Sequence, residues 1–134
     1  MFFLRETFAD EANSSQLFKA DEIRTSNPSQ SHVLLENIDE AQLRHSEKAL
    51  YQYLIALNAF MNGDVQKANI LLNQLIGNTK DTNVKLRALG TLLSVYAASI
   101  DWLSALQTVN IMNDHLDTDP SQKITKLTII KTIF

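Results

Sequence analysis

The sequence predicts an all-α protein, a superhelix of helical hairpins with about seven helices, and three observations support this. Apolar residues recur at helical spacing through residues 48–76. The turn signal Asn62-Gly63-Asp64 interrupts that stretch, as expected where two antiparallel helices join. The same signal returns 37 residues later at Asp101, and a helix–turn–helix unit that recurs at such a period is typical of a solenoid.

The N-terminal third predicts short helices. Residues 1–15 are expected to be loosely held, because Ala12-Asn13-Ser14-Ser15 breaks the helical pattern of the phenylalanines before it. Residues 16–25 predict a short helix. Asn27-Pro28 joins a favourable N-cap to a proline suited to the first helical turn, so a second short helix follows. A loop is expected over residues 39–45.

The central hairpin begins with a long helix over residues 46–62, apolar on most of its sides and therefore expected to be covered on most sides. Gly63 suits the left-handed conformation that ends many helices. Asp64 can cap a second helix over residues 65–76. Gly77-Asn78 is expected to stop that helix.

A second hairpin follows, with a helix over residues 83–100 whose N-cap is Asp81 or Thr82. Gly90 lies in the middle of this helix, which costs about 1 kcal/mol relative to alanine. We expect another backbone to come close to it. Asp101 repeats the capping role of Asp64, and the helix that it starts ends near Leu116.

The C-terminal stretch begins with Asp119-Pro120, the same cap-and-proline start as Asn27-Pro28. A further helix is predicted over residues 123–134. Its apolar residues at helical spacing form a candidate self-association face: Ile124, Leu127, Ile130, Ile133 and Phe134. An exposed face of this kind favours association with a second copy, so we expect a homodimer through this helix.

The two hairpins align residue by residue at a spacing of 37. Ala68 and Ala105 occupy the same place early in the second helix of each hairpin. A small side chain there lets two helices cross closely, so both alanines are expected to be buried.

This pattern resembles the tetratricopeptide repeat, which combines a small residue in its first helix, a Gly-Asp-Tyr type of turn and an early alanine in its second helix. Ala56, Gly63-Asp64-Val65 and Ala68 match that pattern in one hairpin, and Asp101-Trp102 and Ala105 match it in the next. The chain departs from the consensus in its period and in lacking the proline at each repeat end.

The resemblance divides residues 1–134, a single helical-repeat domain, into four parts. These are N-terminal short helices (1–45), repeat one (46–80), repeat two (81–118) and the first helix of a truncated third repeat (119–134).

Residues 17–134 also resemble the extracytoplasmic sensor regions of bacterial tetratricopeptide-repeat diguanylate cyclases, membrane signalling proteins with a C-terminal GGDEF domain. The matching stretches are LFKADEIRTSNPSQSHVLLENI, YQYLIALNAFMNGDVQKANILLNQLI and RALGTLLSVYAASIDWLSAL. The resemblance implies a non-catalytic sensor region in the periplasm, attached to the membrane through segments outside this chain. The alternative is a free-standing scaffold or chaperone-like protein in the cytoplasm that binds a partner segment.

The amino-acid composition argues against several other classes of function. The net charge of −3 gives no electrostatic footprint for nucleic acid. The chain has no cysteine, which removes disulfides and thiolate chemistry. Its three histidines do not form a ligand pattern, and its three glycines lie too far apart for a phosphate-binding loop. We therefore expect no cofactor, no metal and no catalytic site, and a small helical enzyme is the least favoured alternative.

The remaining candidate is a binding surface. In a tetratricopeptide solenoid the first helix of each repeat lines the concave groove. That alignment marks Arg87, Ser94 and Ala98 as a candidate binding face for an unidentified protein or small-molecule ligand. The corresponding residues of repeat one are strongly apolar, so we expect the N-terminal helices to cover them. They are Leu50, Tyr53, Leu57, Phe60 and Met61.

Overall fold

The computed structural model describes residues 2–117 of the chain, and the side chains of residues 11–116. This part holds six α-helices, a short 3-10 helix and no strand, so the prediction of an all-α fold is confirmed. The helices are α1 (Phe2–Glu22), α2 (Pro28–Glu36), α3 (His45–Met61), α4 (Val65–Asn78), α5 (Thr82–Ala98) and α6 (Trp102–Asp117), with η1 (Glu40–Gln42) between α2 and α3. The seventh helix expected from the sequence, over residues 123–134, lies outside the described residues.

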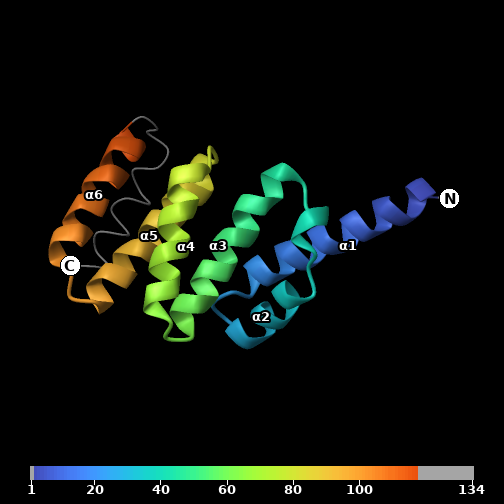
Figure 1. Ribbon diagram of the computed structural model, residues 1–134, viewed down its shortest axis with the longest axis horizontal. Helices are drawn as coiled ribbons and strands as arrows, with labels where there is room; N and C mark the ends of the chain where they lie inside the picture. Colours follow the sequence, from blue (N-terminus) through green and yellow to red (C-terminus); the bar gives the residue numbers. More distant parts are fainter. Residues whose placement is uncertain (1, 118–134) are drawn as a thin grey trace.

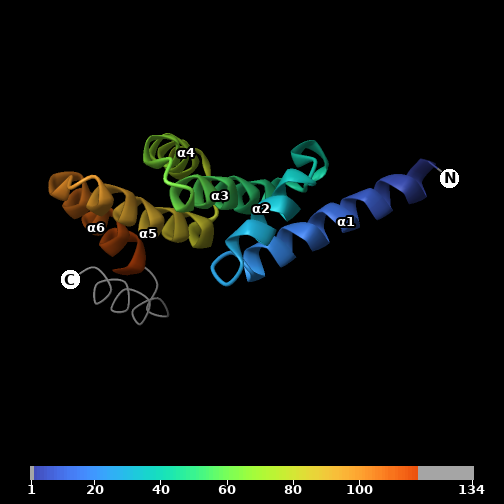
Figure 2. The ribbon, with the colours of Figure 1, turned by 90° about the horizontal axis from the view of Figure 1, so that it is seen from below.

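The six helices pair into three consecutive hairpins, α1–α2, α3–α4 and α5–α6, which follow one another along the molecule (Figure 1). The same order is seen in the view turned by 90° (Figure 2). Each hairpin packs on the next in the same way. The second helix of one hairpin contacts the first helix of the next, α2 on α3 and α4 on α5, and the first helices α1, α3 and α5 also contact in succession. The described part is therefore a row of hairpins, each packed mainly against its neighbours.

The 37-residue period extends to all three hairpins, including the N-terminal one. The second helices start at Pro28, Val65 and Trp102. The residue before each start caps its helix with a side-chain oxygen. Asn27 Oδ1 accepts the Gln30 amide at 3.3 Å. Asp64 Oδ1 accepts the Lys67 amide and Asp101 Oδ1 the Ser104 amide, each at 3.2 Å. These three caps, which the sequence predicts, are confirmed.

The helix crossings repeat with the same period. Ala68 is fully buried and Ala105 is 7% exposed, as the repeat alignment predicts. The equivalent position of the first hairpin is Ser31, which is 1% exposed. Its hydroxyl donates to the Ala20 carbonyl at 2.8 Å, which satisfies a polar group that would otherwise be costly to bury. Residues 1–45 therefore contain a hairpin in register with the other two.

Helix α1 differs from the prediction, because it runs without a break from Phe2 to Glu22. The expected break at Ala12–Ser15 and the separate helix over residues 16–25 are wrong. Asn13 lies 9% exposed on this helix, and its side chain bonds outside it. Its amide donates to Gln42 Oε1 at 3.0 Å, and its carbonyl accepts the Asp39 amide at 3.2 Å. These contacts with the η1 segment offset the low helix propensity of asparagine.

Two of the three glycines also differ from expectation. Gly63 has a φ of 87° and ends α3 as predicted. Gly77, expected to stop α4, lies inside it, because the helix continues to Asn78 and its C-cap is Thr79. A Cβ on Gly90 would meet no heavy atom within 4 Å, so the close approach of another backbone expected there is wrong.

The largest core cluster runs from α1 to α5 and includes the fully buried Leu17, Leu35 and Leu72. A smaller cluster joins α5 to α6 through Leu89, Leu93, Ala105 and Met112. The apolar face of α3 is largely covered, as expected from its composition. Tyr53 is buried and Leu50, Leu57 and Phe60 are half-buried, while Met61 at the helix end is 41% exposed.

Candidate functional site

One concave feature of the described part lies between α3 and α4. The two helices meet at the turn over residues 62–64 and separate towards their other ends (Figure 1). Small buried residues lie near the closed end, Ala59 on α3 and Ala68 on α4, and they allow the backbones to approach. Longer side chains occupy the open end. Residues from both helices line a groove between the N-terminal half of α3 and the C-terminal half of α4.

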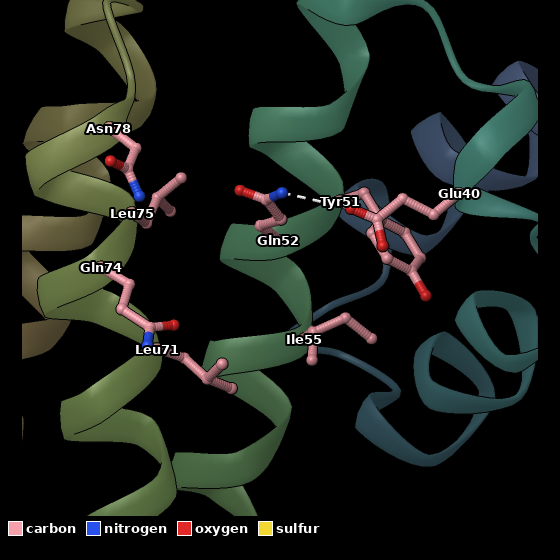
Figure 3. Close-up of a pocket in the computed structure, with 8 residues that line it drawn as sticks. All are labelled: Glu40, Tyr51, Gln52, Ile55, Leu71, Gln74, Leu75 and Asn78. Carbon is pink, nitrogen blue, oxygen red and sulfur yellow. Dashed lines mark hydrogen bonds between the residues drawn. The ribbon is translucent and has the colours of Figure 1, made fainter.

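The first lobe of this groove has a volume of about 360 Å³, within the range of ligand sites in proteins. Figure 3 shows Gln52 of α3 in the space between the helices, with Gln74, Leu75 and Asn78 extending from α4 towards it. The Gln52 amide donates to Glu40 Oε1 at 3.1 Å, which ties the lobe to η1 (Figure 3). The remaining lining residues are Tyr51, Ile55 and Leu71.

The second lobe, of about 630 Å³, continues from the first, because Gln52, Leu75 and Asn78 line both. It extends to the start of α3 and to the α4–α5 connection. Its charged side chains lie at these two ends, Lys48 on α3 and Lys80 and Asp81 in the connection. Carboxamides and apolar side chains line most of the groove, the carboxylate of Glu40 lies beside Gln52, and the other charged side chains lie at the start of α3 and in the α4–α5 connection.

Tyr51 keeps its phenol neutral at this site. Partial burial raises the pKa of the Tyr51 hydroxyl above its ordinary value, and the negative charges of Glu40 and Asp39 raise it further. A neutral phenol donates one hydrogen bond and accepts others. Tyr51 therefore adds a polar group without charge to the wall of the first lobe.

Arg87, the first of the predicted binding residues, bonds within the protein. Its guanidinium donates to both carboxylate oxygens of Asp21 on α1, at 2.5 and 3.3 Å, and lies 4.7 Å above the centre of the Tyr53 ring. Arg24 contacts the same carboxylate at 3.3 Å. Burial lowers the pKa of Arg87, but the hydrogen bonds and charge of Asp21 outweigh it, so the pKa lies above its ordinary value. Arg87 is thus a permanent cation held in an ion pair between the first and third hairpins.

Ser94 and Ala98 are exposed on α5 and lie at helical spacing from Arg87. The structure thus places the three predicted binding residues on one helix, with Arg87 directed to Asp21. Their binding role stays a prediction. The groove between α3 and α4 was not identified from the sequence. In the sequence, the groove is represented only by the carboxamide residues Gln52, Gln74 and Asn78, which are spread over two helices. Such residues are ordinary on a solvated helix surface, so they do not indicate a groove.

The predicted self-association face, Ile124, Leu127, Ile130, Ile133 and Phe134, lies outside the described residues. Among residues with described side chains, no group of three or more histidine, aspartate or glutamate residues is placed to hold a metal ion. No helix within residues 2–117 is long and apolar enough to cross a membrane.

Comparisons of the chain with family models, with curated proteins and with solved structures give no match. The relation to tetratricopeptide repeats and to diguanylate cyclase sensors therefore stays a prediction.

Proposed function

We propose that this chain is a binding module of the tetratricopeptide-like superhelix type, and that it holds an extended peptide segment in the groove between α3 and α4. The observation that carries the proposal is the composition of the groove. Three carboxamide side chains, Gln52, Gln74 and Asn78, converge on a space that Leu71 and Leu75 also line.

Carboxamides match the chemistry of an extended peptide. Each offers an N–H donor and a carbonyl acceptor, the same pair of groups that every peptide unit presents. A peptide in the extended conformation leaves these groups unpaired, and a side-chain amide can bond both. The groove would thus recognise the main chain of its ligand, as other peptide-binding proteins do at sheet edges.

The apolar lining sets the preferred side chain of the ligand. Ile55, Leu71 and Leu75 supply hydrocarbon surface in the first lobe. Burying an aliphatic or aromatic side chain there contributes about 1.5–3 kcal/mol if it is fully covered. Because Glu40 adds a negative charge beside Gln52 and the other charges lie towards the ends of the groove, a segment with one large apolar residue and no acidic side chain next to it is the expected ligand.

In the signalling protein that the resemblance implies, this module would be the periplasmic sensor region, and binding would change helix packing towards an attached catalytic domain. In the scaffold alternative, the same groove would hold a segment of a cytoplasmic partner. Both readings share a non-catalytic binding role. They differ in whether the natural gene continues into a membrane span and a GGDEF segment, which its full sequence decides.

The test is selection of binders from a library of random linear peptides displayed on phage, followed by calorimetry with the purified protein. We expect peptides with one large apolar residue that bind in the micromolar range. Affinity for Gln52→Ala/Gln74→Ala should fall by a factor of about 5 to 150, because two lost hydrogen bonds contribute roughly 0.5–1.5 kcal/mol each.

The matched control is Gln107→Ala, which removes the same side chain from an exposed position on α6 outside the groove. It should bind the selected peptides like the unmodified protein. Selection of no peptide, or of peptides that bind Gln52→Ala/Gln74→Ala with unchanged affinity, would contradict the proposal.

A further inference from the structure

The two lobes of the groove between α3 and α4 differ in the sign of their charge. Among the described residues that line the first lobe, Glu40 is the only charged one. The second lobe is lined by Lys48 and Lys80, together with Asp81. A negatively charged group of a ligand would therefore be repelled in the first lobe, and its fate in the second depends on whether the lysines or Asp81 dominate there.

The carboxylates that follow these lysines or precede them in the sequence already have partners. Asp81 caps α5, because its Oδ1 accepts the Val84 amide at 3.1 Å. Glu47 is 8% exposed, and its Oε1 accepts the Arg44 amide at 3.1 Å at the start of α3. The helix dipole partly compensates a carboxylate in such a position. The lysines therefore dominate the charge of the second lobe.

Lys48 and Lys80 have no carboxylate partner in the part of the chain with described side chains. Neither forms an ion pair there, whereas Arg87 and Arg24 both contact Asp21. Lys48 is half-buried on α3, and Lys80 is exposed in the α4–α5 connection. Both line the same lobe, one from each side of the groove. The second lobe thus offers two cations to a ligand.

The positions on α3 give the distance between the two lobes. Ile55 lines the first lobe, Gln52 lines both, and Lys48 lines the second. At 1.5 Å per residue along a helix, Lys48 lies about 10 Å from Ile55. In an extended peptide, residues two positions apart project to the same side and lie about 7 Å apart. The flexible four-carbon stem of lysine spans the difference.

We propose that the groove selects peptide segments with an acidic side chain two residues away from the large apolar one, and that Lys48 and Lys80 hold the acidic group. This inference rests on the proposed function, since it requires a peptide in the groove. The apolar side chain occupies the first lobe, which Ile55 and Leu71 line. The second lobe continues past Lys48 to His45, which leaves room for the ligand chain to continue. The carboxylate is therefore assigned to a side chain and not to a chain end.

The probes are short labelled peptides with blocked ends, in which serines surround one leucine and one variable residue. Fluorescence anisotropy with the purified protein compares aspartate, serine and lysine two positions from the leucine, on either side of it. A half-exposed ion pair changes an equilibrium by roughly 1.5- to 5-fold, so with two lysines the aspartate peptide should bind about 2- to 30-fold more tightly than the serine peptide. The lysine peptide should bind more weakly than either. Aspartate directly beside the leucine should give no gain, because it projects to the opposite side.

The protein variant Lys48→Glu/Lys80→Glu should reverse this order, so that the lysine peptide binds more tightly than the aspartate peptide. The matched control is Lys67→Glu/Lys85→Glu, which makes the same change of charge at one exposed and one half-buried lysine outside both lobes. It should keep the order of the unmodified protein. Far-ultraviolet circular dichroism checks that both variants keep their helices.

Equal affinities of the unmodified protein for the aspartate, serine and lysine peptides would overturn this inference and leave the proposed function in place. Equal changes in both double variants would overturn it as well, because they would show an effect of net charge alone. Absence of binding by every peptide would remove the proposed function and this inference together. A serine peptide that gains affinity only when its C-terminus is left free would assign the lysines to a chain end, against the side chain proposed.

Discussion

The second and third hairpins share one design and differ in the residue at their turns. In both, the residue before the N-cap has a positive φ, 87° at Gly63 and 57° at Ile100. Both turns have the same hydrogen bonds. The Asp64 amide donates to the Ala59 carbonyl and the Asp101 amide to the Tyr96 carbonyl, each at 2.9 Å. Glycine adopts this conformation freely, whereas a β-branched residue is strained there. The packing of the two helices thus determines the turn geometry, because Ile100 adopts the left-handed conformation although isoleucine disfavours it.

The crossing alanines give the largest expected difference between the two hairpins. Replacing Ala68 by leucine should lower the free energy of unfolding by about 1–3 kcal/mol, because an enlarged side chain overpacks a fully buried crossing. Ala105→Leu should cost less, since Ala105 keeps 7% exposure and lies in the smaller cluster between α5 and α6. Urea denaturation of both variants measures the difference. Equal costs would show that the two crossings are equally confined.

The turns give an effect of opposite sign in the two hairpins. Ile100→Gly should stabilise the protein by about 1 kcal/mol, because it removes the strain of a left-handed non-glycine residue. Ile100 is 74% exposed, so the substitution gives up little buried surface. The reverse change, Gly63→Ile, should destabilise by about 1–2 kcal/mol for the same reason. The midpoint of thermal unfolding reports both, and a stabilising Gly63→Ile would contradict the shared geometry of the turns.

The two helical glycines give the smallest effect. Gly90→Ala should raise the free energy of unfolding by about 0.5–1 kcal/mol, because alanine is the better helix former. The added methyl group meets no heavy atom within 4 Å. Gly77→Ala is the matched control, since Gly77 also lies in a helix with open space around its Cβ position. Loss of stability in Gly90→Ala with a gain in Gly77→Ala would indicate a contact at Gly90 that the structure does not contain.

The features predictable from the sequence are those that depend on nearby residues. The caps at Asn27, Asp64 and Asp101 bond to amides three residues ahead, so their pattern is visible in a short window. Helix starts and the 37-residue register follow from them. The burial of Ala68 and Ala105 follows from that register in turn.

The features that were missed depend on distant partners. Asn13, in the middle of the continuous helix α1, bonds to residues 26 and 29 positions away. Ser31 can be buried at a helix crossing because its hydroxyl donates to the Ala20 carbonyl. Because the sequence has a polar serine where the other hairpins have alanine, the first hairpin was not recognised as a repeat. The groove between α3 and α4 depends on how far two helices diverge, which no residue pattern states. The pairing of Arg87 with Asp21 was also not predictable, because the two residues are 66 positions apart in the sequence.

The ion pair between Arg87 and Asp21 has a consequence for cooperativity. In an ideal array of repeats, stability is a sum of nearest-neighbour terms, and the end units can unfold independently. Here a bidentate contact joins residues 66 positions apart, from the first hairpin to the third, across the Tyr53 ring of the second. Unfolding either end removes a partner from the other, so the two ends lose stability together. The first and third hairpins are therefore coupled directly as well as through the second hairpin. Amide protons of α1 near Asp21 and of α5 near Arg87 should exchange less independently than in an array without this contact.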